Sequence, residues 1–170
     1  TLGVIRECGA GLFGAVSSPS YPVDGYRSAI LMMRQELDLY ANIRPVKSWP
    51  YVSPRSGIDM IIVRENSEGL YAGRERSDGE TAVAERIITR QASRRIAQKA
   101  VDVSRQLGRK RLTIVHKANV LPLSDGLFRY TVRDVVRDEL AVDELLVDVA
   151  PLKMVAEPER FDVLVTTNLF

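Results

Sequence analysis

Three short apolar runs constrain the fold of this chain more than any other feature. They are DMIIV at 59–63, LTIV at 112–115 and FDVLV at 161–165. Continuous apolar runs of this length are typical of strands that are buried on both faces. They therefore predict a parallel or mixed sheet. Two weaker runs lie at 12–16 and 39–43, and the second ends where a proline favours extended backbone.

Helical patterns separate the apolar runs. Apolar residues recur at helical spacing over 26–38, 82–107 and 126 to about 138. Gly108 can take the left-handed conformation that ends the long helix, and Ser124 or Asp125 can cap the next one. The alternation of strands and helices predicts an α/β fold.

Two polar stretches are expected to be loops. The segment 48–57 contains two prolines and has no apolar period. The segment 72–82 has the Asp78-Gly79 turn signal and predicts an exposed hairpin or arm. Such polar extensions often pair with a partner chain, so we expect the arm to contribute to dimerisation.

Composition excludes several classes of function. Hydrophobic residues make up 45% of the 170 residues, enough for one sizeable core and part of another. The net charge of +2 is too small to indicate a nucleic-acid binder, and Arg86, Arg90 and Arg94, spaced by four residues, are interpreted as a solvated helix face. Neither a membrane span nor a leader peptide is seen, and Cys8 is the single cysteine. We expect a cytoplasmic protein with Cys8 buried.

Polar and cationic residues follow the predicted strands. Arg44, Arg64, the HKAN segment at 116–119 and the TTN segment at 166–168 all stand at carboxyl ends. In open α/β sheets ligands bind beyond those ends, so these side chains are expected to meet at one edge. Guanidinium groups there suit a small polyanion, and Arg34 can complete the cluster. The alternative is that each arginine forms a separate salt bridge.

Three further residues, Lys117, Tyr71 and Asp148, have both a functional and a structural interpretation. Lys117 is either a proton-transfer group or a surface lysine, and Tyr71 is either a proton donor or a tyrosine at the edge of the core. Asp148 is either a ligand of a hard cation or a cap. His116 is the only histidine and is interpreted as structural, because one histidine is too few for a zinc site.

Five segments resemble successive blocks of the β-decarboxylating dehydrogenases, the family of isocitrate, isopropylmalate, homoisocitrate and tartrate dehydrogenases. The segments are LDLYANIRPVKS (37–48), DMIIVRENSEGLYAG (59–73), HKANVLPLSDGLF (116–128), LLVDVAPLKMV (145–155) and ERFDVLVTTNLF (159–170). They occur in the order and at the spacing of the family. The resemblance implies the isopropylmalate/isocitrate dehydrogenase-like fold, a mixed parallel/antiparallel sheet flanked by helices with an extended dimerisation arm.

Within the family, LFGAVSSPSYPVDGYRSAI (12–30) and HKANVLP (116–122) are most similar to the homoisocitrate-specific members. This implies NAD-dependent and Mg²⁺- or Mn²⁺-dependent oxidative decarboxylation of homoisocitrate to 2-oxoadipate, in lysine biosynthesis. The alternatives are an isocitrate or isopropylmalate dehydrogenase, or a non-catalytic regulatory subunit. The implied partners are a small hydroxyacid substrate and a second copy of the chain.

The resemblance also implies a substrate site. Arg34, Arg44 and Arg64 match the arginines that hold the carboxylates of the malate core shared by these substrates. Ser18 lies in the segment that reads the variable part of the substrate.

Four more residues match groups close to the reacting atoms. Tyr71 matches the tyrosine that protonates the enol carbon after carbon dioxide leaves, and Lys117 matches the lysine that assists removal of the hydroxyl proton. Asn119 matches a residue near the nicotinamide, and Asp148 matches the first of three magnesium-binding aspartates. In the family, the lysine and the aspartate come from the neighbouring subunit.

Some blocks of the family have no counterpart here. The opening Gly-Asp-Gly-Ile-Gly block and the Gly-Asp-x-x-Ser-Asp block, which supplies the other two metal aspartates, are not found. We therefore expect the central part of an enzyme, inactive by itself. Residues 1–39 are expected to be part of the first, cofactor-side domain, and residues 40–170 to form the substrate-binding and dimerisation domain.

Overall fold

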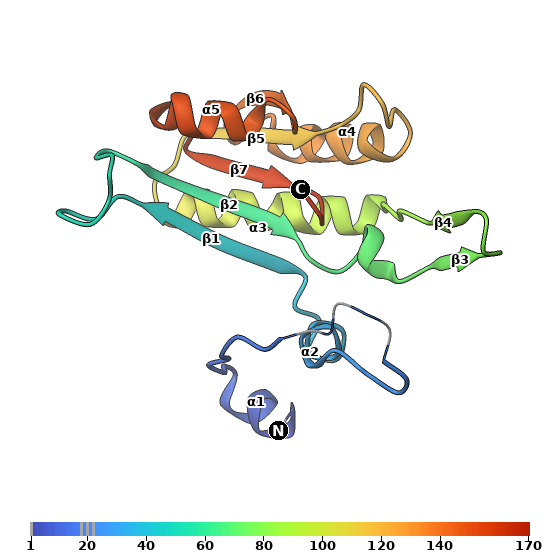
Figure 1. Cartoon of the computed structure of the whole chain (residues 1–170). Coiled ribbons are helices and arrows are strands. Elements are labelled where there is room, and N and C mark those ends of the chain that lie inside the picture. Colours follow the sequence, from blue (N-terminus) through green and yellow to red (C-terminus); the bar gives the residue numbers. More distant parts are fainter. Residues whose placement is uncertain (1, 18, 20, 22) are drawn as a thin grey trace. The chain divides into compact units, whose positions relative to one another are not determined.

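The chain divides into two compact units, Thr1–Leu39 and Tyr40–Phe170. The structure is a computed structural model that describes residues 2–17, 19, 21 and 23–170 (Figure 1). The roles expected of the two units remain predictions.

The first unit contains two short helices, α1 (Leu2–Cys8) and α2 (Ala29–Glu36). The side chain of Ser28 caps α2 by accepting a hydrogen bond from the backbone N–H of Leu31 at 3.4 Å. Arg6 donates to the Glu36 carbonyl at 2.8 Å. Two expectations are wrong in this unit: residues 12–16 form no strand, and Cys8 is exposed. An apolar run becomes a strand only when a neighbouring strand pairs with it.

The second unit is built on a mixed five-stranded sheet, which confirms the predicted fold class. The strands lie in the order β1-β2-β7-β5-β6, and β1 alone runs antiparallel to its neighbour (Figure 1). Their bounds are β1 (Ala41–Lys47), β2 (Asp59–Glu65), β5 (Arg111–His116), β6 (Ala141–Leu146) and β7 (Val163–Thr166). β1 extends past its predicted end through Pro45, because an edge strand tolerates a residue without an N–H donor.

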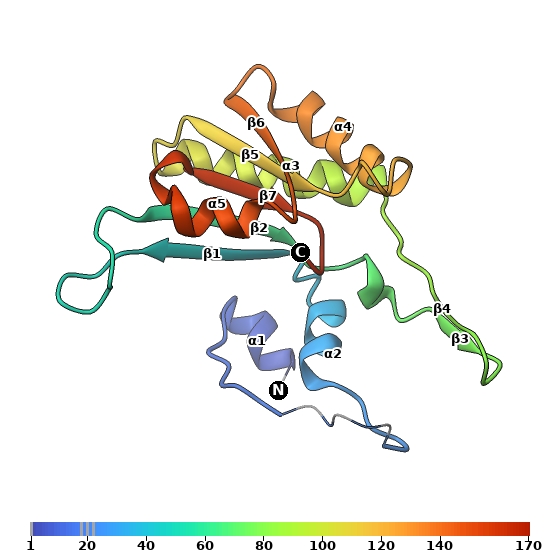
Figure 2. The same ribbon diagram turned by 45° about the horizontal axis from the view of Figure 1, so that its top comes forward.

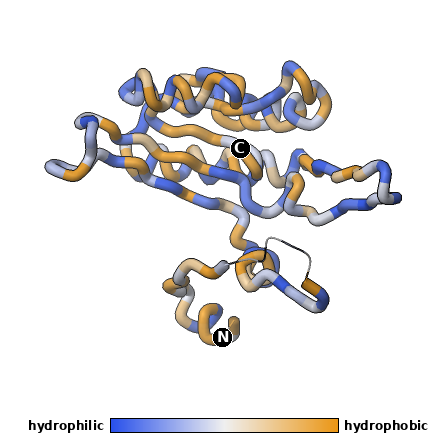
Figure 3. Tube along the Cα trace, viewed as in Figure 1, coloured by the Kyte–Doolittle hydropathy of each residue, from blue (hydrophilic) through white to orange (hydrophobic). Residues whose placement is uncertain are grey.

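Helices cover both faces of this sheet. The helices α3 (Arg90–Gln106) and α4 (Ser124–Val136) pack on one face, and α5 (Ala150–Ala156) packs on the other (Figure 2). Ile96, Leu112, Phe128 and Val163 are almost completely buried in the larger core. Burial of one such side chain stabilises the fold by roughly 1.5–3 kcal/mol. Figure 3 shows the corresponding hydrophobic colour along the central strands.

The long helix starts later than the sequence pattern predicts. Thr89 caps α3 by accepting from the Ala92 N–H at 3.1 Å, and Glu68 in turn accepts from the Thr89 N–H at 2.9 Å. The predicted helical segment 82–88 instead contains strand β4 (Ala82–Ala84). At the other end Gly108 has φ +65°, which confirms its predicted left-handed conformation.

The polar arm is a hairpin, as predicted. Strand β3 (Glu75–Ser77) pairs antiparallel with β4, and Gly79 takes φ +96° in the turn. The Asp78 carboxylate fixes the turn by accepting from the backbone N–H groups of Glu80 at 3.0 Å and Thr81 at 2.7 Å. Dimerisation through this arm remains a prediction.

The predicted arginine stripe is wrong for one of its members. Arg86 lies before α3, in the segment between the arm and the helix, and its side chain is only 12% exposed. Asp125 also differs from its predicted role, because it lies inside the first turn of α4 and the residue before that helix makes no side-chain cap. No helix in the described ranges has the length and apolar character needed to cross a membrane.

Candidate functional site

The carboxyl ends of four parallel strands meet at one edge of the sheet. The register places Arg64 of β2 beside Thr166 of β7, and Thr166 beside Val115 of β5. On the other side of β2, the antiparallel pairing places Asn42 of β1 opposite Arg64. Residues directly opposite one another on paired strands project from the same face, so this row of side chains shares one face.

Arg64 is held at this edge by neutral groups. It donates to the Oδ1 atom of Asn168 at 2.7 Å, and its guanidinium carbon lies 5.6 Å from the centre of the Tyr71 ring. Asn168 is completely buried and donates from Nδ2 to the carbonyl of Glu68 at 2.9 Å. One buried amide therefore fixes both Arg64 and the loop that presents Tyr71.

The loop after β2 is shaped by its own sequence. The buried Glu65 carboxylate accepts from the N–H groups of Ser67 at 2.8 Å and Glu68 at 3.0 Å. Gly69 has φ +81°, and a Cβ there would lie 3.2 Å from the carbonyl oxygen of Asn168. Tyr71 follows in the short 3₁₀ helix η1 (Leu70–Ala72), half-exposed at 39%. Only glycine permits both this backbone and the close approach of Asn168.

Arg44 lies in the middle of the antiparallel strand β1 and not at a carboxyl end, so the expectation that it follows a strand is wrong, but it lies on the same face as Arg64. It pairs in register with Ile62, two residues before Arg64, and its Nε donates to Asn42 Oδ1 at 2.9 Å. Across the part of the chain that is described, no carboxylate lies within ion-pair distance of Arg44 or Arg64. Separate salt bridges, the alternative explanation for these two arginines, are therefore not formed with any described residue.

Lys117 and Asp148 are brought together at the ends of β5 and β6. The Nζ group of Lys117 donates to the Asp148 carboxylate, which lowers the pKa of Asp148 below its usual value. The Val147 N–H donates to the His116 carbonyl at 2.9 Å and ties the two strand ends together. Within one copy of the chain, no hydrogen bond or ion pair among the described residues joins this pair to Arg64 or Tyr71.

The remaining predicted site residues are not brought into either cluster. Asn119 is exposed in the turn that follows Lys117. Arg34 lies half-buried near the end of α2 in the first unit, and its place in a shared site stays a prediction. Ser18 lies outside the described residues, so its role stays a prediction too.

His116 has the surroundings of a structural residue. It is 6% exposed, and its Nδ1 atom accepts from the Ala118 N–H at 3.1 Å. Burial lowers the pKa of His116, an effect opposed by the Glu144 carboxylate 3.9 Å away. No group of three or more histidine, cysteine or acidic residues among those described is arranged to hold a metal ion. Asp148 is thus a single exposed oxygen donor.

Sequence reasoning missed three residues behind these clusters. Asn168 was placed at a strand end without a role, Asp125 was interpreted as a cap, and Arg86 as part of a solvated face. All three have their partners on other elements, so no local pattern signals their roles. The one available signal is a polar segment directly after an apolar run, and Asn168 is the third residue of such a segment.

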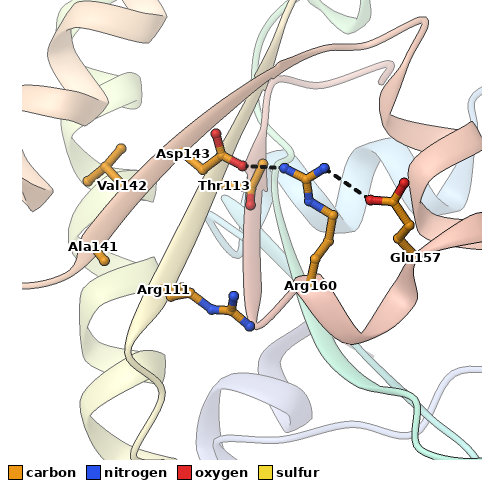
Figure 4. Close-up of a pocket in the computed structure, with 7 residues that line it drawn as sticks. All are labelled: Arg111, Thr113, Ala141, Val142, Asp143, Glu157 and Arg160. Carbon is orange, nitrogen blue, oxygen red and sulfur yellow. Dashed lines mark hydrogen bonds and ion pairs between the residues drawn. The ribbon is translucent and has the colours of Figure 1, made fainter.

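A pocket at the opposite edge of the sheet is less suited to an anion. It measures about 360 Å³ and lies at the amino ends of β5 and β6 (Figure 4). Arg160, which lines it, donates to Asp143 at 2.8 Å and lies 3.4 Å from Glu157. The positive charge is therefore neutralised by carboxylates within the pocket itself.

Comparison with known proteins fits this geometry. The family model described as isocitrate/isopropylmalate dehydrogenase matches residues 1–170. The chain belongs to this family. The family resemblance seen in the sequence is thereby confirmed.

Individual relatives agree. The chain is 48% identical to the isocitrate/homoisocitrate dehydrogenase of Thermus thermophilus, covering 99% of this chain and 51% of the relative. It is 43% identical to the 3-isopropylmalate dehydrogenase of Methanothermobacter thermautotrophicus, covering 100% and 51%. The crystal structure of isocitrate dehydrogenase from Methylococcus capsulatus matches with a TM-score of 0.84 and 36% identity, covering 99% and 56%. The chain thus spans about half the length of the curated relatives it matches.

Proposed function

We propose that the full-length protein catalyses the NAD-dependent and divalent-cation-dependent oxidative decarboxylation of a 3-substituted malate, with homoisocitrate as the preferred substrate and 2-oxoadipate as the product. Membership of the family supports the reaction class. The Thermus thermophilus relative, whose name includes homoisocitrate, supports the substrate. Lysine biosynthesis in the cytoplasm is the corresponding cellular role.

The observation that carries this proposal is the environment of Arg64. A guanidinium group held by an amide, rather than by a carboxylate, keeps its positive charge for a ligand. Arg44 shares the same face and is also held only by an amide. Two such arginines on one face of the sheet suit the carboxylates of a hydroxyacid, with Arg34 as the expected third.

Lys117 and Tyr71 are proposed as the two proton-transfer groups. Lys117, once it has given up a proton and is a neutral amine, would accept the proton of the substrate hydroxyl, and bound NAD would supply the acceptor for hydride from the carbon that bears this hydroxyl. Loss of carbon dioxide then leaves an enol, and the phenol of Tyr71 donates a proton to its carbon. The Arg64 guanidinium 5.6 Å from the Tyr71 ring orients that ring beside the bound carboxylate. Each group is expected to contribute ~10²–10⁴-fold to the rate.

Asp148 fits one position in the shell of a hard cation. Its carboxylate is 58% exposed, which leaves oxygen lone pairs open beside the bond from Lys117. Mg²⁺ or Mn²⁺, when bound, supplies Lewis acidity toward the oxygens of the substrate. The remaining ligands would come from residues that this chain does not place beside Asp148. Asn119 is proposed to lie near the nicotinamide of NAD.

Assembly as a homodimer is proposed from the family resemblance, and the absence of a described bond between the two clusters of one copy is consistent with it. Lys117 and Asp148 make no described bond to Arg64 or Tyr71 of the same copy. We propose that Lys117 and Asp148 of one copy complete the arginine and tyrosine cluster of the other. Residues 40–170 would then bind substrate and form the dimer contact, with residues 1–39 belonging to the cofactor-side domain.

Three alternatives stay within the family. The isopropylmalate relative, at 43% identity, favours a substrate with an apolar substituent, and the Methylococcus capsulatus structure favours isocitrate. A non-catalytic regulatory subunit is the third candidate, but the chain retains both Tyr71 and Lys117.

A steady-state assay of the full-length protein separates these possibilities. Homoisocitrate, isocitrate and isopropylmalate would be compared with NAD and NADP in the presence of Mg²⁺, with a chelator as the metal-free control. We expect the highest kcat/KM for homoisocitrate with NAD. Turnover of isocitrate alone would reject homoisocitrate and retain the family reaction, whereas no turnover of any substrate would favour the regulatory subunit.

A further inference from the structure

A buried ion pair lies directly behind Lys117. Asp125, in the first turn of α4, is completely buried, and its Oδ2 atom accepts from the backbone N–H of Lys117 at 2.5 Å. Its Oδ1 atom forms an ion pair with Arg86. Arg86 also donates to the hydroxyl groups of Thr167 at 2.9 Å and Ser124 at 3.2 Å. The pair therefore connects the end of β5 to α4, to the end of β7 and to the base of the arm.

The geometry fixes the path of the backbone at Lys117. Its N–H is held by Asp125, and its carbonyl accepts from the N–H groups of Val120 at 3.0 Å and Leu121 at 2.9 Å. With both of its backbone polar groups bound, Lys117 has little freedom in φ and ψ. The direction of its Cα–Cβ bond, and so the region its amine can reach, is set by these contacts.

Only a carboxylate satisfies the two partners of Asp125. The Lys117 N–H and the Arg86 guanidinium are both donors, and each faces a different oxygen. An asparagine would offer one oxygen and one NH₂ group, so one donor would face another donor. Residue 125 must therefore carry a negative charge to hold both partners at once.

We propose that Asp125 is a positioning residue for Lys117, with Arg86 holding the Asp125 carboxylate in place. This inference rests on the proposed role of Lys117 in proton transfer. Asp125 does not touch the substrate. It acts by aiming the amine, so its loss lowers the rate of the chemical step and leaves substrate binding by Arg44 and Arg64 intact.

The opposite end of the same strand supplies a matched control. Asp162 accepts from the backbone N–H groups of Lys110 at 2.7 Å and Arg111 at 3.2 Å, and it lies 3.2 Å from Arg109. It thus repeats the arrangement of Asp125, one carboxylate bonded to backbone amides and to an arginine. Asp162 lies immediately before β7, and its side chain bonds to the amino end of β5, the end opposite Lys117.

The experiment compares Asp125→Asn with Asp162→Asn in the full-length protein. Thermal midpoints, and kcat and KM for homoisocitrate, would be measured for both. Both variants are expected to have a lower midpoint. Asp125→Asn is expected to lower kcat by about tenfold or more with KM changed less than about threefold, since small misplacements of a reacting group have effects of this size. Asp162→Asn should keep kcat, and Asp125→Glu, which restores two acceptor oxygens, should recover part of the rate.

Equal kcat values in the two asparagine variants would overturn the proposal and leave Asp125 with a structural role only. If Asp125→Asn fails to fold, Arg86→Lys replaces it, because lysine keeps the charge but cannot reach both the carboxylate and Thr167. The same loss in kcat without a change in KM is expected, and an unchanged kcat would count against the proposal. Lys117→Met, assayed alongside, tests the proposed function of Lys117 separately from the positioning role of Asp125. Full activity in that variant rejects the proposed function, whereas its inactivity beside a fully active Asp125→Asn rejects only the positioning role.

Discussion

The arginines at the amino ends and at the carboxyl ends of the parallel strands, here called the amino edge and the carboxyl edge of the sheet, have different partners. At the amino edge Arg109 lies 2.6 Å from Asp59 and 3.2 Å from Asp162, and Arg160 lies 2.8 Å from Asp143. At the carboxyl edge Arg64 is bound by the amide oxygen of Asn168. Arg86 at the carboxyl edge is also paired with a carboxylate, that of Asp125, but Arg64 has no carboxylate partner among the described residues.

The partner of an arginine decides whether it serves the fold or a ligand. A guanidinium paired with two carboxylates has few donors and little net charge left to offer. A guanidinium held by an amide is oriented equally well and keeps its full charge. The paired arginines Arg109 and Arg160 therefore serve the fold, whereas Arg64 is the arginine proposed to bind an anion. Three matched pairs of variants and one single variant, compared with the parent, test this contrast.

The largest effect is expected from the lysines that flank β5. Lys117→Met should lower kcat by ~10²–10⁴-fold, because it removes the proposed proton acceptor. Lys110→Met, at the exposed start of the same strand, should leave kcat unchanged. Steady-state kinetics of the full-length protein check both, and similar rates for the two variants would remove the functional distinction between the ends of the strand.

Variants of Arg64 and Arg109 should separate an effect on substrate binding from an effect on the stability of the fold. Arg64→Gln should raise KM by roughly 10–100-fold, the loss of one charge-assisted interaction of about 1.5–3 kcal/mol. Arg109→Gln should leave KM alone and lower the free energy of unfolding by about 1–3 kcal/mol, because Asp59 and Asp162 lose their partner. Substrate titration and urea unfolding distinguish the two results. A raised KM in Arg109→Gln would mean that the amino edge also contributes to binding.

Substitutions of two glycines in the loop after β2 test whether Asn168 holds Arg64 in place. Gly69→Ala should raise KM several-fold, because its Cβ would come within 3.2 Å of the Asn168 carbonyl and displace the residue that holds Arg64. Gly73 also has positive φ, +68°, but a Cβ there meets nothing within 4 Å. Gly73→Ala should cost about 1 kcal/mol of stability with no change in KM. Equal KM values in the two variants would argue against Asn168 as the support.

The smallest effect concerns acid stability at the carboxyl edge. Burial lowers the folded-state pKa of His116 below its value of 6.5 in the unfolded chain. The unfolded state then binds more protons as the pH falls below this value, so the stability contributed by neutral His116 is lost toward acid pH. His116→Asn, which keeps an acceptor for the Ala118 N–H, should lose less stability than the parent between about pH 8 and about pH 5. Identical urea midpoint shifts over this range would show that His116 is not the titrating group.

Local patterns predicted the elements whose own residues specify them. β2, β5 and β7 were expected because each is a continuous apolar run, and their presence also identified the α/β class. The hairpin turn at Asp78-Gly79 was expected from two residues alone. Elements that depend on neighbours were missed or misplaced. β6, with Asp143 and Glu144 in its middle, has no continuous apolar run, and it is a strand because β5 pairs with it.

The start of the long helix shows the same limit. Ala84, Ile87 and Ile88 continue the apolar period of α3, so the sequence predicted one helix from 82. Pairing of β4 with β3, a bridge between Gly69 and Ile87, and the Thr89 cap overrode that period. Tertiary contacts outweighed helical periodicity there.

The sequence by itself determined that β2, β5 and β7 are strands and that Arg64 and Lys117 stand at the carboxyl ends of β2 and β5, because both are properties of neighbouring residues. Only the tertiary structure decided which partner each cation has. Arg64 meets an amide 104 positions away, and Arg86 meets a buried carboxylate 39 positions away rather than solvent. Such partners depend on which strands lie side by side in the sheet, and no local pattern encodes that spatial order. The physical difference between an arginine that stabilises the fold and one that is free to bind an anion lies in that choice of partner.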